Sequence, residues 1–536
     1  MSALVTDQFR ILNATNFIES IDNDSYYVWV GLTNPNRYTG FGRNENWDGG
    51  TTPGGSPVTN GVVPNPIDNL DYLTQYEDTL LFGKKVTSSN IRRVVKRVDW
   101  VRGKKYDMYR HDYSINNLSP VAKRARLYDS EFYVLNSDYK VYICIQNGSS
   151  GVNTTGNQSL YEPTHTDLEP SIAGTGGDGY RWKYLFTVSP GDIVKFDSTE
   201  YITLPNNWNT STDSQIVSVR QNGDSEVNNN QIKTVYIDNP GENYDGGLNQ
   251  GKEVDILGDG TGGRVFVQVN SNGEITNTTV TSGGKGYTYG IVDLGSLQPE
   301  VNITNPARLI PIIPPSKGHG YDLYKELGAD RVMIYSRFDD SSRDFPINTK
   351  FCQIGILKNP TKFVGIETFT DSQFSGLYAI KFDSVNNTLP AIGEKIIQTT
   401  TSSGITTVAV GYVASYDSDT KVLKYFKDRS LYYGPTHDQT DYVGVSTEGD
   451  ANKSFSNPGG TVVGESSGFN GIQISSLTGI TTTVNGAIIN LGVTFTNGLA
   501  NPEINKKTGD IIYIDNRPLV SRNIRQKEDI KIILEF

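Results

Sequence analysis

Cysteine, histidine and methionine are scarce in this sequence, which has two, four and three of them among 536 residues. Cys144 and Cys352 lie in separate apolar, strand-like runs, with no CxxC or Cys/His spacing around them. The histidines are too far apart in sequence for a local zinc site; they are His111, His165, His319 and His437. We therefore expect two buried free thiols, assembly in a reducing cytosol and no metal site.

Long apolar runs and blocks of like charge are absent as well. No run approaches the ~18 apolar residues of a membrane-spanning helix, and the first twenty or so residues lack the basic and apolar regions of a secretory signal. The formal net charge is −11, from 48 Lys and Arg against 59 Asp and Glu. That sign disfavours general binding to nucleic acid or anionic membranes. We expect a soluble globular chain with no nucleic-acid partner and no membrane insertion.

Motifs of catalytic and nucleotide-binding sites are also missing. GDGTGG (258–263) matches G-x-G-x-x-G, but the next residues, RVFVQV, predict a strand where a dinucleotide site needs a helix. GGKGYT (283–288) lacks the spacing of a phosphate loop, and no Gly-x-Ser-x-Gly elbow marks a nucleophile. Asp339 and Asp340 lie in a turn beside Arg and Ser, where we expect solvated loop charges. We predict no catalytic or cofactor-binding residue, no cofactor and no enzyme activity.

Glycine is abundant, with 55 residues, and it separates short segments rich in β-branched and aromatic residues. This pattern predicts a mainly β, multi-domain protein with a smaller α/β part (α+β), in which antiparallel sandwich or barrel-like domains are inserted into a discontinuous core. The predicted strands are YYVWVGL (26–32), EFYVLN (131–136), KVYICIQ (140–146), RWKYLFTV (181–188), RVFVQV (264–269), RVMIYSRF (331–338), CQIGIL (352–357) and VAVGYVASY (408–416).

Two segments carry the spacing of amphipathic helices. In residues 6–21, Asp7 is placed to cap the first turn. The apolar face predicted for this helix consists of Phe9, Leu12, Phe17 and Ile21. In residues 65–85, the predicted apolar face consists of Leu70, Leu73, Leu80 and Leu81, and the stop signal of Gly83, Lys84 and Lys85.

One internal repeat is visible. IKTVYIDNPGENY (232–244) and ITNTTVTSGGKGY (275–287) align without gaps, and each predicts a strand, a glycine-containing turn and a closing tyrosine, Tyr244 or Tyr287. Two copies indicate one small duplicated β-domain. The predicted division is a discontinuous α/β core (1–90, 310–360 and 501–536), a β-rich domain (91–215), an inserted β-domain with the repeat (216–309) and an inserted Gly/Ser/Thr-rich β-domain (361–500).

The segment YRWKYLF alternates aromatic with charged or aliphatic residues. A strand here places Tyr180, Trp182 and Tyr184 on one face, with Arg181, Lys183 and Leu185 on the other. The aromatic face suits either a core or an interface. Near the C-terminus, Arg517 lies between a predicted strand and Pro518. Its guanidinium can pair with a carboxylate of a neighbouring chain or with one in its own turn, and the pattern does not choose between them.

Several sequence blocks follow one another in the order found in a known family. They are VTDQFR with NFIESI, FGRNENW ending at Trp47, RRVVKRVDW ending at Trp100, GDGYRWKYLF followed by EYITLP, KFCQIGILKNP, and GDIIYIDNRP followed by a strand that reaches Phe536. In these blocks the chain resembles the dimeric baseplate wedge subunit of T-even-like contractile-tailed bacteriophages. The blocks cover roughly a quarter of the chain. The repeat and most of residues 361–500 have no obvious counterpart in that shorter family.

The resemblance implies a non-enzymatic virion protein of the phage tail baseplate, assembled in the host cytoplasm. Its expected partners are a second copy, as a homodimer, and other baseplate wedge proteins. The candidate structural or interface residues are Trp47, Trp100, Tyr180, Trp182, Tyr184, Tyr513 and Arg517. Two other classes stay open: a tail-fibre or receptor-binding adhesin with a glycan-binding β surface, which is usually trimeric, and a tail-associated glycan hydrolase, which needs two convergent carboxylates.

Overall fold

The structure is a computed structural model, and its described residues form two compact units, each built from separate pieces of the chain. Unit 1 comprises Met1–Phe17, Arg92–Met333 and Ile532–Phe536, and unit 2 comprises Ile18–Ile91 and Ile334–Lys531. Within them, the structure describes residues 6–31, 80–223, 231–247, 250–298, 303–339, 345, 350–392, 394–402, 405–426, 455, 459–522 and 526–536. Antiparallel sheets dominate both units, which confirms the mainly β, multi-domain prediction.

The first predicted helix is present as α1 (Asp7–Asn23), but two details of its prediction were wrong. Thr6 caps the helix rather than Asp7, because the Phe9 backbone N–H donates to Thr6 Oγ1 at 3.3 Å. Phe9 and Leu12 are 53% and 52% exposed, whereas Ile11 is 4% exposed and belongs to the core of unit 1. The buried stripe therefore passes through Ile11 and the small Ala14, which a count of large apolar residues does not favour.

Three short helices belong to unit 1. They are α3 (Pro190–Phe196), α4 (Ser214–Gly223) and α5 (Leu323–Leu327). Ser189 caps α3 by accepting a hydrogen bond from the Asp192 backbone N–H. Asp322 caps α5 in the same way, and Gly328 ends it in the left-handed conformation that favours glycine. Single 3₁₀ turns cover Ser88–Asn90, Leu127–Asp129 and Gly295–Leu297.

The main core of unit 1 surrounds a three-stranded antiparallel sheet. Its strands, in order, are β4 (Tyr133–Leu135), β5 (Lys140–Asn147) and β6 (Tyr180–Thr187). A four-stranded sheet whose residues are divided between the two units has the order β29-β14-β3-β7, with β3 (Ile91–Lys96), β7 (Tyr201–Thr203), β14 (Arg331–Phe338) and β29 (Glu528–Glu535). The strands predicted over 140–146 and 331–338 are present, and the one predicted over 181–188 is present but ends at Thr187.

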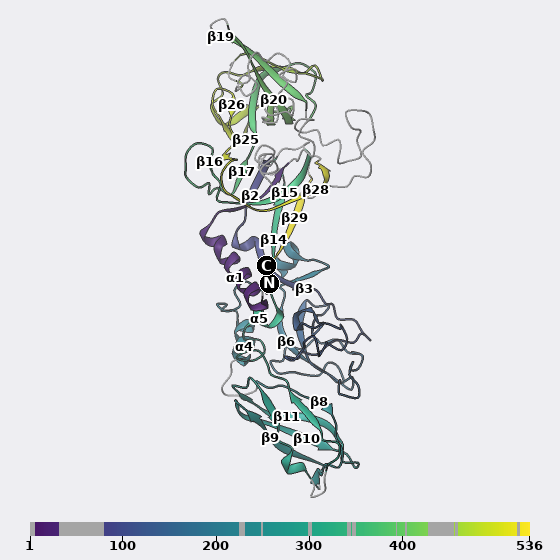
Figure 1. Cartoon of the computed structure of the whole chain (residues 1–536). Coiled ribbons are helices and arrows are strands. Elements are labelled where there is room, and N and C mark those ends of the chain that lie inside the picture. Colours follow the sequence, from purple (N-terminus) through teal and green to yellow (C-terminus); the bar gives the residue numbers. More distant parts are fainter. Residues whose placement is uncertain are drawn as a thin grey trace. The chain divides into compact units, whose positions relative to one another are not determined.

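The repeat region of unit 1 forms a small β-domain with its own core. A four-stranded sheet contains β11 (Ile275–Lys285), β10 (Thr261–Val269), β9 (Gly251–Gly258) and β12 (Gly290–Val292), and a two-stranded sheet pairs β8 (Val235–Asn239) with β13 (Arg308–Pro311). Figure 1 shows β9, β10 and β11 side by side. GDGTGG forms the hairpin turn between β9 and β10, so no helix follows it.

The two repeat copies share a local structure. Gly241 and Gly284, which align, have φ angles of +66° and +58°. A Cβ at either glycine would lie 2.7 Å from the ring of the closing tyrosine, Tyr244 or Tyr287. Each tyrosine hydroxyl in turn accepts a hydrogen bond from a distant backbone N–H, at 2.9 Å for Tyr244 and 3.1 Å for Tyr287. Glycine is required at both positions because the tyrosine ring occupies the space of a side chain.

One sheet of unit 2 contains strands from four distant parts of the sequence. Its order is β17 (Gln373–Ser375), β2 (Leu80–Lys85), β1 (Tyr26–Gly31), β15 (Lys350–Lys358) and β28 (Asp510–Ser521). The helix predicted to end at Lys85 was therefore wrong over its last six residues, and residues 65–79 lie outside the described ranges. Leu80 and Phe82 are fully buried in a strand, since pairing with β1 overrides the helical spacing.

The other part of unit 2 is a closed six-stranded antiparallel barrel. Around the barrel run β21 (Val422–Phe426), β20 (Ile405–Asp417), β19 (Lys395–Ser402), β22 (Thr461–Gly464), β23 (Asn470–Gln473) and β18 (Tyr378–Val385), and β18 pairs again with β21. Ile380, Phe382 and Leu423 are among the residues that fill it. Four further strands are β16 (Thr361–Lys362), β24 (Gly479–Val484), β25 (Ala487–Phe495) and β27 (Ile504–Asn505), and β26 (Leu499–Ala500) adds to β18.

Candidate interaction sites and a buried polar cluster

The predicted aromatic face of β6 lies in the core of unit 1. Tyr180, Trp182 and Tyr184 are each 0% exposed. The rings of Tyr180 and Trp182 stack at 5.4 Å, and the Tyr180 hydroxyl donates to the Asn157 carbonyl at 2.9 Å. These side chains fix the fold of unit 1 and present no surface to another chain.

Of the two candidate tryptophans outside β6, only Trp100 lies among the described residues. Trp100 is half-buried, and its indole N–H donates to Ser159 Oγ at 2.9 Å. Trp47 lies outside the described residues.

The predicted free thiols are confirmed, because Cys144 and Cys352 are both buried and unbridged. Asp339 is not the solvated charge we expected: its side chain is 17% exposed and lies 3.7 Å from the Lys84 ammonium.

Tyr513 and Arg517 lie on β28, at the end of its five-stranded sheet. In the described part of the chain, β28 pairs with β15 along one edge and with no strand along the other. Arg517 Nε lies 2.6 Å from Asp515 Oδ2, while 57% of the Arg517 side chain stays exposed. Burial and the Asp515 charge raise the pKa of Tyr513. The pair within the strand leaves the predicted contact of Arg517 with a neighbouring chain open.

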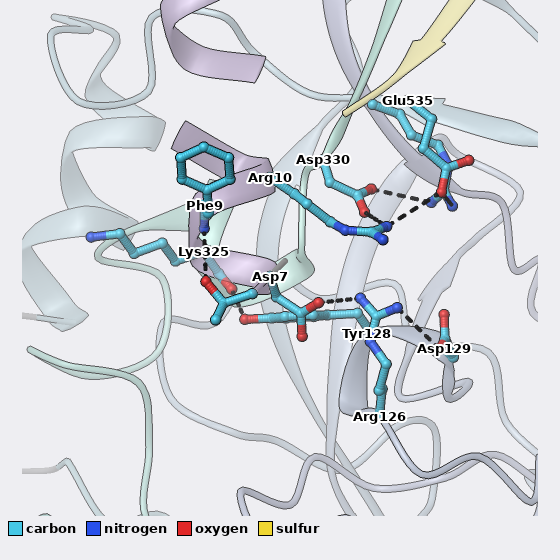
Figure 2. A network of polar contacts seen from close by, with 11 residues as sticks. Asp7, Phe9, Arg10, Arg126, Tyr128, Asp129, Lys325, Asp330 and Glu535 are labelled. Carbon is cyan, nitrogen blue, oxygen red and sulfur yellow. Dashed lines mark hydrogen bonds and ion pairs between the residues drawn. The ribbon is translucent and has the colours of Figure 1, made fainter. Parts of the chain in front are cut away.

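A polar network in unit 1 joins the first helix to the last strand (Figure 2). Arg10 lies 3.8 Å from the Asp330 carboxylate and 3.7 Å from Glu535, which also pairs with Arg331 at 2.9 Å. Beside them, the Phe536 backbone N–H donates to the Asp330 carbonyl at 3.1 Å. The first turn of α1 and the last residues of the chain are thus held to one place in unit 1.

A second part of this network holds Asp7, the residue predicted to cap α1. Its carboxylate pairs with the Arg126 guanidinium instead, and Arg126 also lies 3.8 Å from Asp129 (Figure 2). The Tyr128 hydroxyl donates to the Lys325 carbonyl at 2.7 Å. Sequence reasoning missed this network, because its members come from four separate segments and no local motif connects them.

The face of β6 opposite the aromatic residues carries a buried polar cluster. Lys183 is 0% exposed, and its Nζ donates to the Leu168 carbonyl at 2.5 Å and to Asn222 Oδ1 at 2.8 Å. The Asn222 amide nitrogen donates to Glu169 Oε1 at 2.9 Å, and Lys233 Nζ donates to Glu169 Oε2 at 2.7 Å. The alternation of YRWKYLF placed Lys183 on this face, but it did not reveal that the face is covered.

Burial and charge set the ionisation of this cluster. Burial, and then the charge of Lys233, lowers the pKa of Lys183 to about 8. Burial raises the pKa of Glu169, but the hydrogen bond and charge of Lys233 and the hydrogen bond from Asn222 outweigh it, so the net shift is downward. The cluster therefore combines an ionised carboxylate with a buried amine that loses its proton more easily than an ordinary lysine.

The described residues bring no metal site together. No three His, Cys, Asp or Glu side chains among them are placed to hold an ion. Over the same residues, the structure contains no helix with the length and apolar character to cross a membrane.

The described residues thus form two multi-segment units rich in antiparallel sheet, and ion pairs within unit 1 connect α1 to β29. No family model matches it. A stretch of 220 residues is 25% identical to the baseplate wedge protein gp8 of Enterobacteria phage T4. That stretch covers 38% of this chain and 60% of the phage T4 protein, so the chain spans less than two thirds of that relative's length. The similarity supports a distant link to baseplate wedge proteins, in line with the resemblance seen in the sequence blocks.

Proposed function

We propose that this protein is a non-enzymatic structural subunit of a phage tail baseplate, which forms a homodimer and bridges other wedge proteins. The observation that carries the proposal is the 25% identity over 220 residues with a baseplate wedge protein. The sequence blocks of the resemblance and the mainly β architecture support it. The protein acts mechanically: its interfaces hold partners in one arrangement and let them shift as rigid bodies when the tail contracts.

The polar network at the two ends of the chain suits a protein that holds its partners in one arrangement. Arg10 near the start of the chain and Glu535 near its end contact each other at 3.7 Å within unit 1. The Phe17 and Phe536 rings pack 5.5 Å apart beside them. A load applied to α1 or to β29 is therefore borne by the same packed region of unit 1.

For the dimer contact we propose the open edge of β28, with Arg517 as its charged anchor. A strand edge without a neighbour exposes backbone N–H and C=O groups that a second strand can pair with. Among the candidate residues in the described part of the chain, Arg517 is the exposed one. Two copies of β28 can meet antiparallel about a two-fold axis, so that each Arg517 reaches a carboxylate of the other copy.

Two measurements test these proposals. Light scattering on a sizing column, over a dilution series, gives the absolute mass; we expect a persistent dimer for the wild type and a monomer for Arg517→Ala. Arg264→Ala is the matched control, since Arg264 is also ion-paired and 57% exposed, and it should leave the dimer intact. A monomer at every concentration would contradict the homodimer, and a stable trimer would favour an adhesin.

Co-elution with the purified baseplate proteins of the same phage tests the baseplate role itself.

A further inference from the structure

The buried cluster on β6 has the composition and order of a site for amide exchange. An amine, Lys183 Nζ, contacts a carboxamide, Asn222 Oδ1, and a carboxylate, Glu169 Oε1, accepts the hydrogen bond of that carboxamide's nitrogen. We propose that Lys183 and Asn222 form an intramolecular isopeptide bond, with Glu169 as the group that moves the proton.

The geometry supplies the reacting atoms in the required order. Lys183 Nζ lies 2.8 Å from Asn222 Oδ1, and the carbonyl carbon that it must attack is bonded to that oxygen. The Leu168 carbonyl, 2.5 Å from Nζ, holds the amine from the other side. Because a fixed amine beside a carbonyl behaves as a highly concentrated reactant, a small rotation of the Asn222 side chain brings the pair into a reactive arrangement.

The reaction needs no oxidant, reductant or cofactor. The lone pair of the neutral Lys183 amine forms a bond to Asn222 Cγ, and the bond from Cγ to Nδ2 breaks. Glu169 takes one proton from Nζ and delivers it to Nδ2, which leaves as ammonia. The product is a secondary amide between the two side chains, and the chain becomes lighter by one ammonia, about 17 Da.

The surroundings favour each step. The full burial of Lys183 keeps water from competing with the amine. Its lowered pKa, about 8, gives more of the neutral nucleophile near neutral pH than an ordinary lysine has. The lowered pKa of Glu169 keeps that carboxylate ionised and able to accept a proton. The bond would tie β6 covalently to the end of α4.

A second reaction of Asn222 releases ammonia too, and the test must separate the two. Asn222 is followed by Gly223, whose backbone nitrogen is unhindered and can close on the same carbonyl carbon to form a succinimide. The isopeptide bond joins two peptides after proteolysis, whereas the succinimide leaves them separate. The isopeptide bond also requires Lys183, and the succinimide does not.

The experiment is intact mass spectrometry of the purified full chain, held at pH 8.5 for several days, followed by peptide mapping with an Asp/Glu-specific protease. We expect the wild type to be one ammonia lighter than its sequence mass and to yield one branched peptide containing Lys183 and Asn222. Lys183→Arg should keep the full mass. Lys140→Arg is the matched control and should lose ammonia like the wild type, because Lys140 on the neighbouring strand donates to a backbone carbonyl and not to a carboxamide.

Glu169→Gln tests the proton transfer without removing the reacting pair. It should stay folded by circular dichroism and form the bond at least tenfold more slowly, in line with the usual contribution of a general base. Full mass and two separate peptides for the wild type would overturn the proposal. A wild type with no branched peptide, in which Asn222 is a succinimide or, after its hydrolysis at pH 8.5, an acid about 1 Da heavier, would overturn it in favour of the succinimide. Neither outcome bears on the baseplate role, which is tested by co-elution.

Discussion

Strands β6 and β28 both lie at the edge of a sheet and both contain aromatic and charged residues, yet their outer edges are in opposite environments. The outer edge of β6 is covered: Ser171 and Trp182 exchange two backbone hydrogen bonds of 2.9 Å, and Lys183 binds the Leu168 carbonyl. The outer edge of β28 has no paired strand in the described part of the chain. Sequence alternation therefore sets which side chains share a face, and the covering segment decides whether that face is core or surface.

The same contrast separates the two basic residues. Lys183 is fully buried and satisfied by two oxygens, whereas Arg517 is 57% exposed and pairs with Asp515 of its own strand. A buried charged group must be hydrogen-bonded, which restricts the positions of the groups around it. An exposed ion exchanges partners with water at little cost, which leaves Arg517 available to another chain.

The largest expected difference between the two strands is in packing. Trp182→Ala should lower the free energy of unfolding by about 3–5 kcal/mol, because it removes a fully buried indole stacked on Tyr180. Tyr513→Ala should cost about 1 kcal/mol, since that ring is half-buried at an open edge. Urea unfolding followed by circular dichroism measures both. Similar costs for the two substitutions would show that β28 is packed as tightly as β6 in solution.

A second contrast uses one chemical change in both strands. Lys183→Met should cost about 1–3 kcal/mol, because the Leu168 carbonyl and Asn222 Oδ1 lose their donor while buried. Arg517→Met should stay within about 0.5 kcal/mol in the monomer, measured at low protein concentration. If the isopeptide bond forms, its loss adds about 4 kcal/mol to the first value, because it closes a loop between residues 39 apart. Equal costs would contradict the burial difference.

Local patterns predicted individual strands well. The segments containing Trp29, Trp182 and Ile334 became β1, β6 and β14, because β-branched and aromatic residues next to glycine or polar turns favour strands whatever they pair with. The aligned glycine and closing tyrosine of each repeat copy form the same contact, although Gly284 lies in β11 and not in the predicted turn. These features depend on a few neighbouring residues, so the local sequence is enough to predict them.

Long-range features could not be predicted in this way. Leu80 lies in a helical spacing but pairs with Gly31 in a strand, and Phe9 has the spacing of a buried residue but lies on the exposed side of α1. The cluster of Lys183, Glu169 and Asn222 brings together a strand, a loop and a helix end, and no motif connects them. Partner choice in such cases is decided by tertiary packing, which one chain's local pattern does not encode.

The smallest expected effect concerns the exposed pair of β28. Asp515→Asn should lower the free energy of unfolding by less than about 0.5 kcal/mol at low ionic strength, because Arg517 stays largely solvated. In 1 M salt the difference should vanish, since the screening length falls to ~3 Å. Asp255→Asn, which removes the exposed pair with Arg264 at 3.3 Å, should show the same salt dependence. If the effect of Asp515→Asn persists in high salt, or is several-fold larger than that of Asp255→Asn, the edge of β28 is covered in solution. The dilution series should then show the protein concentration at which a second copy dissociates from that edge.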